Sequence, residues 1–449
     1  MPVYFSIAKL GAILEPNLVQ INNPTGENLA LDVVGITTDT RAVKPQELFI
    51  ALVGENFDGH NFVESAASKG VIAVVVQQQI DSVDIPQFIV KDTLQAYQQL
   101  AQWWRNRLNI PIVGVTGSVG KTSTKELIAA VLGTQGKVLK TEANFNNEIG
   151  VPKTLLQITP DHDYGVIEMA MRGEGEIALL TKIARPTIGV ITNVGTAHIG
   201  RLGSREAIAR AKCELLAQMP QTSTAILNYD NLLLIETAAK VWQGKTITYG
   251  LTGGDIQGDI KGDKIRVLER DLPLPLPGEH NASNYLAAVA VAQALSIDLA
   301  PLVKGLQVEL PTGRSRRYDL PNDIVVLDET YNAGLESMLA AVQMLKETPG
   351  TRHIAVLGTM KELGDYSPQL HRQVGEKAQE LNLDLLMVLA DEKATVEMAQ
   401  GAAKINTECF SDRTSLTKKL KQIIRPGDRI LCKASNSVGL SKVVEELVN

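Results

Sequence analysis

Short hydrophobic runs alternate with longer stretches of helical periodicity along most of the chain. Runs such as Ile112–Val115 and Ile354–Leu357 predict buried strands, and the longer stretches predict helices. Strands that alternate with helices usually form a parallel sheet whose faces the helices cover. The longest apolar runs, such as Val71–Val76, are far shorter than the ~20 residues that a membrane-spanning helix needs. The pattern therefore predicts an α/β protein without a membrane span.

The same pattern divides the 449 residues into three domains, which agrees with the usual size of a domain. Residues 1–108 contain short strands, among them Val33–Ile36, and helical patches, so we predict an N-terminal α/β domain. Residues 109–311 alternate strand and helix and predict a central parallel sheet. Residues 312–449 predict a small Rossmann-like domain, but they lack the G-x-G-x-x-G fingerprint of a dinucleotide site.

The stretch Pro111–Lys125, PIVGVTGSVGKTSTK, predicts a nucleotide phosphate loop in the central domain. A buried strand, a glycine turn, Lys121-Thr122 and a helix to Leu132 follow one another as such a loop requires. Glycines let backbone N–H groups approach phosphate oxygens, and the helix N-terminus adds partial positive charge. An ordinary strand-to-helix turn is the alternative, and the flanking elements disfavour it. The residues expected to bind ATP here are Gly117, Ser118, Val119, Gly120, Lys121, Thr122 and Ser123.

Composition narrows the class of protein further. The net charge is −6 and no long basic run occurs, which argues against nucleic acid as the main partner. The chain has three widely spaced cysteines, Cys213, Cys409 and Cys432, which indicate neither a disulfide framework nor a metal site. Free cysteines and the lack of a signal-peptide pattern predict a reducing, cytoplasmic location. We expect a monomer.

The phosphate loop is an uncommon variant, with Val115 where the usual pattern has Gly or Ala. In this respect it resembles the ATP loop of the Mur ligases and the folylpolyglutamate synthases. Other segments resemble the Mur ligases in the order of that family, and the resemblance spans nearly the whole chain. These segments are TTDTRAVKPQELFIALVGENFDGH, TEANFNNEIGVP, DYGVIEMA, NVGTAH and GEHNASNYLAA.

The resemblance implies that the first domain binds the UDP end of a substrate. The residues that match are Thr38, Thr40, Arg41, Asp58 and His60, with Thr40 in place of a serine. In the central domain, clustered hydroxyls and amides suggest a hydrogen-bonding rim, and the family has a substrate segment there. The corresponding residues are Thr141, Asn144, Asn146 and Asn147.

Glu168 ends an apolar strand beside the phosphate loop, where a metal ligand is expected, although such a residue is often just an exposed carboxylate. Likewise His198 is an ordinary polar residue by itself, and Lys212 could pair with Glu206 or Glu214. The resemblance implies instead a magnesium ion on Thr122 and Glu168, and a second on His198 and a carbamylated Lys212. It therefore implies four catalytic residues: Lys121, Glu168, His198 and Lys212.

Two amides and the last domain complete the predicted nucleotide site. Asn281 and Asn284 are three residues apart and share a helix face, which suits an adenine or a ribose. The resemblance implies that Arg314 and Asp328 reach ATP only when the domains close, so we expect turnover to require closure. It also places the substrate near Tyr331 and Asn332.

The last domain contains LGTMKELGDY and KASNSVG, which resemble the branch of the family that adds D-alanyl-D-alanine. The implied activity is ATP-dependent formation of an amide bond between UDP-N-acetylmuramoyl-tripeptide and D-alanyl-D-alanine. The reaction would pass through an acyl phosphate, with ATP and two Mg²⁺ ions, in peptidoglycan precursor synthesis. Three alternatives remain: a sister ligase that adds a diamino acid or glutamate, a folylpolyglutamate synthase, and a nucleotide-dependent regulatory protein. Ala333-Gly334-Leu335 and Ala434-Ser435-Asn436 depart from the pattern of the branch.

Overall fold

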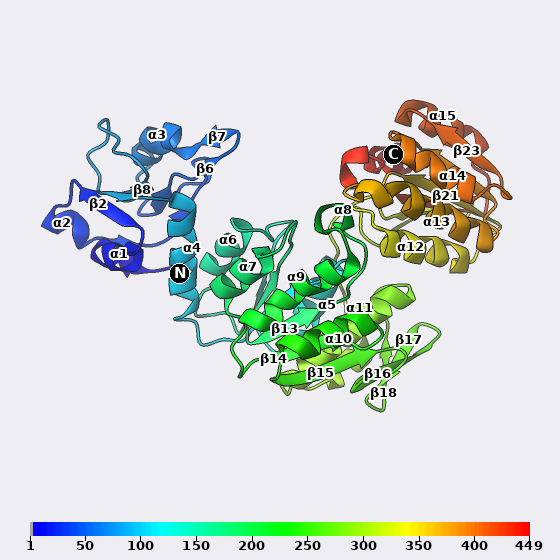
Figure 1. Ribbon diagram of the computed structural model, residues 1–449, viewed down its shortest axis with the longest axis horizontal. Helices are drawn as coiled ribbons and strands as arrows, with labels where there is room; N and C mark the ends of the chain where they lie inside the picture. Colours follow the sequence, from blue (N-terminus) through cyan, green and yellow to red (C-terminus); the bar gives the residue numbers. More distant parts are fainter. Residues whose placement is uncertain (1–2) are drawn as a thin grey trace.

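The computed structural model describes residues 3–449, which form three lobes in sequence order (Figure 1). The N-terminal lobe has a five-stranded sheet of order β2-β9-β8-β5-β4, in which only β2 runs antiparallel to its neighbour. Its strands are β2 (Leu18–Asn22), β4 (Ile36–Thr37), β5 (Leu48–Ile50), β8 (Ala73–Val76) and β9 (Gln87–Val90). Its helices are α1 (Ile7–Leu14), α2 (Gly26–Leu29), α3 (Val63–Ser68) and α4 (Thr93–Arg105).

The run Val33–Ile36, predicted as one strand, is divided between two sheets. Val33 belongs to β3 (Asp32–Val33), which pairs with β1 (Phe5–Ser6). Ile36 belongs to β4 and pairs with Leu48 in the main sheet. Gly35 lies between them against the Glu47 side chain, where a Cβ would come within 2.9 Å of Oε1. A second small pair joins β6 (Val53–Gly54) to β7 (Phe57–Asp58).

The central lobe contains a nine-stranded sheet of order β11-β12-β10-β13-β14-β15-β16-β17-β18. The pairs from β11 to β16 are parallel, as the sequence predicts, and the last two pairs are antiparallel. The strands are β10 (Ile112–Thr116), β11 (Val138–Lys140), β12 (Tyr164–Glu168), β13 (Ile188–Ile191), β14 (Thr224–Asn228), β15 (Lys245–Gly250), β16 (Ile256–Lys261), β17 (Lys264–Val267) and β18 (Arg270–Pro273). The helices are α5 (Lys121–Leu132), α6 (Gly150–Leu156), α7 (Glu176–Ala184), α8 (Ile199–Leu202), α9 (Arg205–Gln218), α10 (Leu232–Val241) and α11 (Glu279–Ala294).

The C-terminal lobe has a six-stranded sheet of order β19-β20-β24-β21-β22-β23, parallel except for the edge strand β19. The strands are β19 (Arg316–Leu320), β20 (Ile324–Asp328), β21 (Arg352–Gly358), β22 (Leu385–Leu389), β23 (Thr407–Phe410) and β24 (Asp428–Lys433). The helices are α12 (Leu335–Glu347), α13 (Ser367–Glu380), α14 (Val396–Gly401), α15 (Arg413–Ile423) and α16 (Ser441–Val448).

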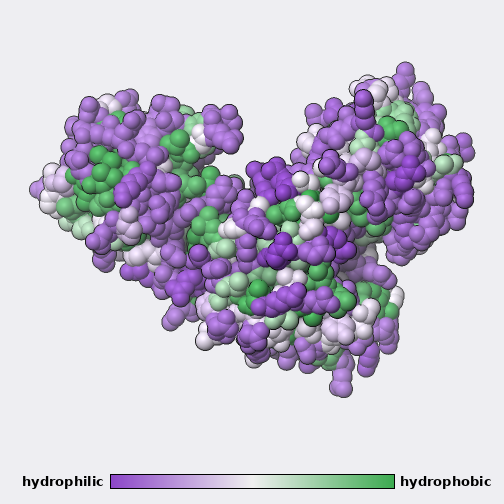
Figure 2. All heavy atoms as spheres, viewed as in Figure 1, coloured by the Kyte–Doolittle hydropathy of each residue, from purple (hydrophilic) through white to green (hydrophobic). Residues whose placement is uncertain are grey.

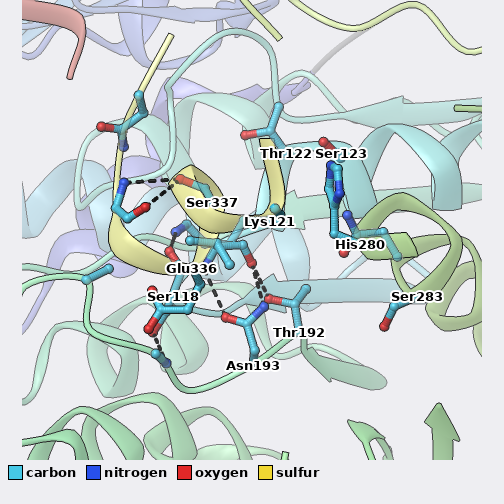
Figure 3. Close-up of a pocket in the computed structure, with 18 of the residues that line it drawn as sticks. Ser118, Lys121, Thr122, Ser123, Thr192, Asn193, His280, Ser283, Glu336 and Ser337 are labelled. Atoms are coloured by element: carbon cyan, nitrogen blue, oxygen red, sulfur yellow. Dashed lines mark hydrogen bonds between the residues drawn. The ribbon is translucent and has the colours of Figure 1, made fainter. Parts of the chain in front are cut away.

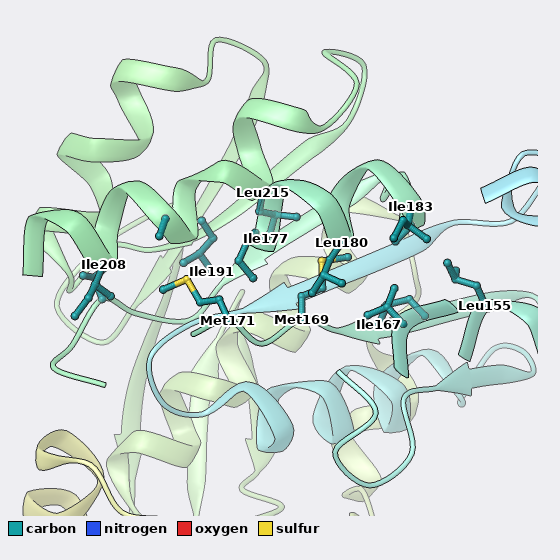
Figure 4. Close-up of a cluster of buried hydrophobic side chains, with 14 of the residues drawn as sticks. Leu155, Ile167, Met169, Met171, Ile177, Leu180, Ile183, Ile191, Ile208 and Leu215 are labelled. Atoms are coloured by element: carbon teal, nitrogen blue, oxygen red, sulfur yellow. The ribbon is translucent and has the colours of Figure 1, made fainter. Parts of the chain in front are cut away.

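The central lobe is held together by apolar side chains on both faces of its sheet. On one face Ile167 of β12 and Ile191 of β13 pack with Ile177 and Leu180 of α7 and with Leu215 of α9 (Figure 4). On the other face α11 packs against α5, and its residues from Tyr285 to Ala292 are buried. Each fully buried aliphatic side chain contributes about 1.5–3 kcal/mol of transfer free energy. These helices therefore fix the sheet edge where the phosphate loop begins.

Helix α4 joins the N-terminal lobe to the central lobe and packs on α6 and α7. Its Trp104 Nε1 donates to the Ile158 carbonyl at 2.9 Å, and Arg105 Nε donates to the Ala184 carbonyl at 2.9 Å. The N-terminal and C-terminal lobes stand at opposite ends of the molecule, with polar side chains over most of the visible face (Figure 2). No helix within residues 3–449 is long and apolar enough to cross a membrane.

Candidate functional site

The predicted phosphate loop connects β10 to α5 at the carboxyl edge of the central sheet. Gly117 and Gly120 have φ angles of +152° and +79°, in the region that favours glycine. A Cβ at Gly117 would collide with Thr192 Oγ1, and one at Gly120 would lie 2.7 Å from Asn284 Oδ1. The loop therefore needs glycine at both positions for its backbone and for its close neighbours.

Polar residues at the end of β13 hold the loop in place (Figure 3). Ser118 N donates to the Asn193 carbonyl and Val119 N to Asn193 Oδ1, each at 3.0 Å. Thr192 Oγ1 donates to the Val119 carbonyl at 2.6 Å. No role was predicted for Thr192 or Asn193 from the sequence. Their position after the strand next to β10 is the signal that could have identified them.

Lys121 is the first residue of α5, and its ammonium lies over the loop. Nζ donates to the Gly117 carbonyl at 2.8 Å and contacts the Ser118 carbonyl at 3.3 Å. Burial lowers the pKa of Lys121, while the Glu168 carboxylate acts in the opposite direction. A phosphate group above the loop would meet this ammonium and the helix N-terminus together, and both favour an anion.

Glu168 and Thr122 form an oxygen-rich pair beside the loop. The register places Glu168 opposite Val115 of β10, and the residue is only 2% exposed. Thr122 Oγ1 donates to Glu168 Oε2 at 2.9 Å, and Asn146 Nδ2 donates to Oε1 at 2.8 Å. A hydroxyl and a carboxylate at this separation are hard ligands that suit Mg²⁺ beside ATP phosphates.

His198 and Lys212 are close enough to Lys121 for its charge to act on both, and within residues 3–449 they form no metal cluster. His198 Nδ1 is 2.6 Å from Glu362 Oε2 of the C-terminal lobe. Burial and then Lys121 lower the pKa of His198, and the same two causes lower that of Lys212 well below its usual value. Within residues 3–449 no group of three His, Cys, Asp or Glu side chains could hold a metal ion. A second metal ion here would therefore need ligands beyond these four types of side chain.

The two asparagines of α11 contact each other and the phosphate-loop helix. Asn284 Nδ2 donates to Asn281 Oδ1 at 3.4 Å, and Thr124 Oγ1 donates to Asn284 Oδ1 at 3.1 Å. Asn281 Nδ2 donates to the Pro277 carbonyl at 2.8 Å. Asn284 lines a cavity beside the phosphate loop, whereas Asn281 is not among the residues that line it. Adenosine binding by this pair stays a prediction.

A cavity of about 380 Å³ lies between the phosphate loop and the C-terminal lobe. From the central lobe it is lined by Lys121, Thr122, Asn193 and others, and Figure 3 shows His280 and Ser283 beside them. The C-terminal lobe contributes residues that include Arg314, Glu329, Asn332, Glu336, Ser337 and Lys433. His280 and Lys433 lie in segments that resemble the family, but no role at the site was predicted for them or for Glu336.

The predicted residues of the C-terminal lobe take different positions at this cavity. The Arg314 guanidinium stacks 4.1 Å from the Tyr331 ring centroid, and its Nε is buried without a hydrogen-bond partner in the part of the chain described. Such an orphaned donor at the cavity suits an anionic ligand. Asp328 accepts from Thr330 Oγ1 at 2.6 Å and is not among the lining residues. Its contact with ATP stays a prediction.

The predicted substrate loop shows how much of its polarity is used internally. Thr141 is fully buried, and its Oγ1 accepts from Glu168 N at 2.9 Å. Asn147 Oδ1 accepts from Gly150 N at 2.9 Å at the start of α6, and Asn146 binds Glu168. Asn144 is exposed. Two residues of this loop, Thr141 and Asn146, therefore bind Glu168 and are not free to bind a substrate through the same atoms.

The residues predicted to bind UDP lie in the N-terminal lobe, outside the cavity. Arg41 forms an ion pair with Asp39 at 2.7 Å. His60 Nδ1 lies 2.6 Å from Asp58 Oδ1, and its Nε2 accepts from Gln77 N at 2.8 Å. The structure therefore separates the candidate site into a nucleotide cavity and a second surface on the first lobe, which also carries Thr38 and Thr40.

Three family models match the chain in succession. "Mur ligase family, catalytic domain" matches residues 32–104, "Mur ligase middle domain" matches 115–292, and "Mur ligase, glutamate ligase domain" matches 313–436. Curated relatives named UDP-N-acetylmuramoyl-tripeptide–D-alanyl-D-alanine ligase match almost end to end. The relative from Synechocystis is 57% identical over 99% of this chain and 97% of its own length. The relative from Escherichia coli is 38% identical over 94% of this chain and 95% of its own.

Solved structures give the same result. A crystal structure of MurF from Acinetobacter baumannii has a TM-score of 0.89 at 30% identity, covering 100% of this chain and 99% of that one. MurF ligase from Thermotoga maritima, in complex with ADP, has a TM-score of 0.82 at 28% identity, covering 92% and 96%.

The parallel sheet, the glycine loop with Lys121 and the facing third lobe define a phosphate-loop ATP-binding protein. The family models and the relatives identify it more closely. The chain belongs to the Mur ligase family, and it is an ATP-dependent ligase that forms an amide bond.

Proposed function

We propose that this ligase joins D-alanyl-D-alanine to the tripeptide of UDP-N-acetylmuramoyl-tripeptide in peptidoglycan precursor synthesis. The observation that carries the assignment is the 57% identity to a curated ligase of this name over 99% of the chain. The site supports it, because the Lys121 ammonium lies on the phosphate loop and the Thr122–Glu168 pair lies beside it.

The chemistry begins with two anions that repel each other. A peptide carboxylate oxygen attacks the γ-phosphorus of ATP, the bond to the ADP oxygen breaks, and an acyl phosphate forms. Lys121 would neutralise the phosphates and hold them in line, since its ammonium already lies above the loop. Thr122 and Glu168 would hold a magnesium ion, which lowers the charge repulsion between the reactants.

The second half of the reaction forms the amide. The amine of D-alanyl-D-alanine attacks the acyl carbon, phosphate leaves with the pair of electrons, and the amine loses a proton. His198 and a carbamylated Lys212 would hold a second magnesium ion, which would orient the carboxylate in the first half of the reaction, and Glu362 contacts the His198 ring. The cavity walls from the C-terminal lobe would keep water from the acyl phosphate.

The first lobe would bind the UDP end of the acceptor through Thr38, Thr40, Arg41, Asp58 and His60. Arg41 is exposed and pairs with Asp39, so its guanidinium is accessible to a ligand. A second binding surface away from the nucleotide cavity suits a long substrate whose two ends are recognised separately.

Phosphate release tests the proposal directly. Purified protein is assayed with ATP, Mg²⁺, UDP-N-acetylmuramoyl-tripeptide and D-alanyl-D-alanine, and each component is omitted in turn. We expect release only when all four are present. Release with glutamate or a diamino acid and not with the dipeptide would assign a sister activity. ATP binding without release for any amine would contradict a ligase.

A further inference from the structure

Lys125 is a second lysine in the phosphate-loop helix, one turn after Lys121. Its side chain is fully buried, and its Nζ donates to the Thr141 carbonyl at 2.6 Å. The same ammonium lies 3.0 Å from Glu126 Oε1 and 3.8 Å from Glu168 Oε2. Nothing in the reaction described above uses this charge.

The acceptors around Lys125 match what an ammonium requires. It has three N–H donors, and three oxygen acceptors lie within 4 Å of it. A buried charge is costly unless it is paired and hydrogen-bonded. The three contacts therefore offset the cost of burying the Lys125 ammonium. The other oxygen of Glu126 binds Lys140, which is half-exposed. Of the two lysines that contact Glu126, Lys125 also lies within 4 Å of Glu168, and Lys140 does not.

Thr141 links this ammonium to the substrate loop. Its carbonyl binds Lys125, while its Oγ1 accepts from Glu168 N at 2.9 Å. Asn146, farther along the loop, returns to Glu168 Oε1 at 2.8 Å. From α5, Lys125 thus contacts the end of β12 through Glu168 and the beginning of the substrate loop through Thr141.

We propose that Lys125 is a positioning residue for the nucleotide–magnesium site, and that its ammonium sets the orientation of the Glu168 carboxylate and the substrate loop. Thr122 and Asn146 contact the two carboxylate oxygens from the side of the loop, and Lys125 contacts Oε2 from within the fold. A carboxylate held from these directions cannot rotate freely, so it is already arranged for a cation. This inference rests on the proposed role of Glu168 as a magnesium ligand.

The test removes the Lys125–Glu126 pair together, because Lys125→Met alone would take the buried ammonium away from two buried carboxylates, Glu126 and Glu168. The variant is Lys125→Met with Glu126→Gln, and the matched control is Lys140→Met with Glu126→Gln. The control removes the same carboxylate charge and a lysine that does not contact Glu168 or Thr141. Each protein is measured by thermal unfolding and by calorimetric binding of ADP, with and without Mg²⁺.

We expect the Lys125 variant to bind ADP without Mg²⁺ as the control does, and at least ~10-fold more weakly with Mg²⁺. An unchanged affinity for ADP in the presence of Mg²⁺ would overturn the proposal, because Lys125 would then serve only the stability of the fold. A tighter affinity would also overturn it, because the ammonium would then compete with the cation. Where the methionine variant does not fold, Lys125→Gln with Glu126→Gln keeps a donor for the Thr141 carbonyl and carries the same expectation. Magnesium-independent ADP binding by the unmodified ligase would instead contradict the metal role of Glu168, whatever the variants show.

Discussion

Lys212 lies in an environment that favours its neutral amine. Its side chain is 1% exposed on α9, and the charges that act on it are Lys121 and Cys213. Burial is the main cause of its lowered pKa, because removing an ammonium from water destabilises the charged form. The alternative that the sequence left open, an ion pair with Glu206 or Glu214, does not form. Glu214 instead accepts from Gly175 N and Ala178 N.

A neutral buried amine can react with carbon dioxide to give a carbamate and a proton, so we expect Lys212 to be carbamylated. The lowered pKa raises the fraction of neutral amine at neutral pH, and a carbamate would supply an anionic oxygen from α9. Protein equilibrated with ¹³C-bicarbonate should show one carbamate resonance by NMR. Removal of dissolved carbon dioxide should lower kcat at least ~10-fold, and bicarbonate should restore it.

Lys212→Arg is the control for that experiment, since it keeps the charge and cannot form the carbamate. It should lack the resonance and show no response to bicarbonate. A full rate in carbon dioxide-free buffer, with no resonance in the unmodified protein, would refute the modification.

At the scale of elements, the sequence predicted best what is local and continuous. The helix predicted from about Thr122 to Leu132 is α5 (Lys121–Leu132), and Gly133 is its C-cap. The strand before it is β10, and the parallel order of its neighbours follows from the alternation of strand and helix. What the sequence did not show is which residues from other elements contact this loop, as with Thr192 and Asn193. These contacts depend on tertiary packing, and no local pattern encodes them.

Gly120→Ala tests the dependence of the phosphate loop on its backbone conformation. Gly120 has a φ angle of +79°, and a Cβ would approach Asn284 Oδ1 to 2.7 Å. Alanine would have to leave this conformation or displace Asn284, and we expect ADP affinity to fall at least ~10-fold. Backbone strain of this kind costs about 1–3 kcal/mol in stability. The measurements are calorimetric ADP binding and the thermal midpoint.

Gly262→Ala is the matched control, because Gly262 also has a positive φ, +64°, but nothing lies within 4 Å of its Cβ position. It lies in the turn between β16 and β17, outside the residues that line the cavity. We expect it to lower the thermal midpoint and to leave ADP affinity unchanged. Equal ADP binding by the two variants would show that the loop tolerates a side chain at residue 120.

At the scale of the molecule, the candidate site is assembled by two lobes. Glu336 accepts from Thr196 N at 2.7 Å, although the two residues are 140 positions apart. Glu362 contacts His198 and Arg201, and Tyr366 Oη donates to the Gly203 carbonyl at 2.8 Å. The sequence indicated separate domains and predicted a role for closure, but the partners across the lobes were beyond its reach. Glu336 and Glu362 have no distinguishing pattern in the sequence, and their contacts arise only where the two lobes meet.

We expect the two carboxylates Glu336 and Glu362 to hold the C-terminal lobe in a productive position. Both contact the segment 195–203, which contains His198, and both belong to the lobe that lines one side of the nucleotide cavity. Glu336→Ala combined with Glu362→Ala should broaden the lobe orientations, increase the radius of gyration in small-angle scattering and lower kcat at least ~10-fold. The phosphate loop lies on the central lobe, so ADP affinity should change by only a few fold. Asp365→Ala, an exposed neighbour of Glu362, is the control and should match the unmodified ligase. If the double variant had a larger radius of gyration and the full rate, turnover would not require the lobes to close.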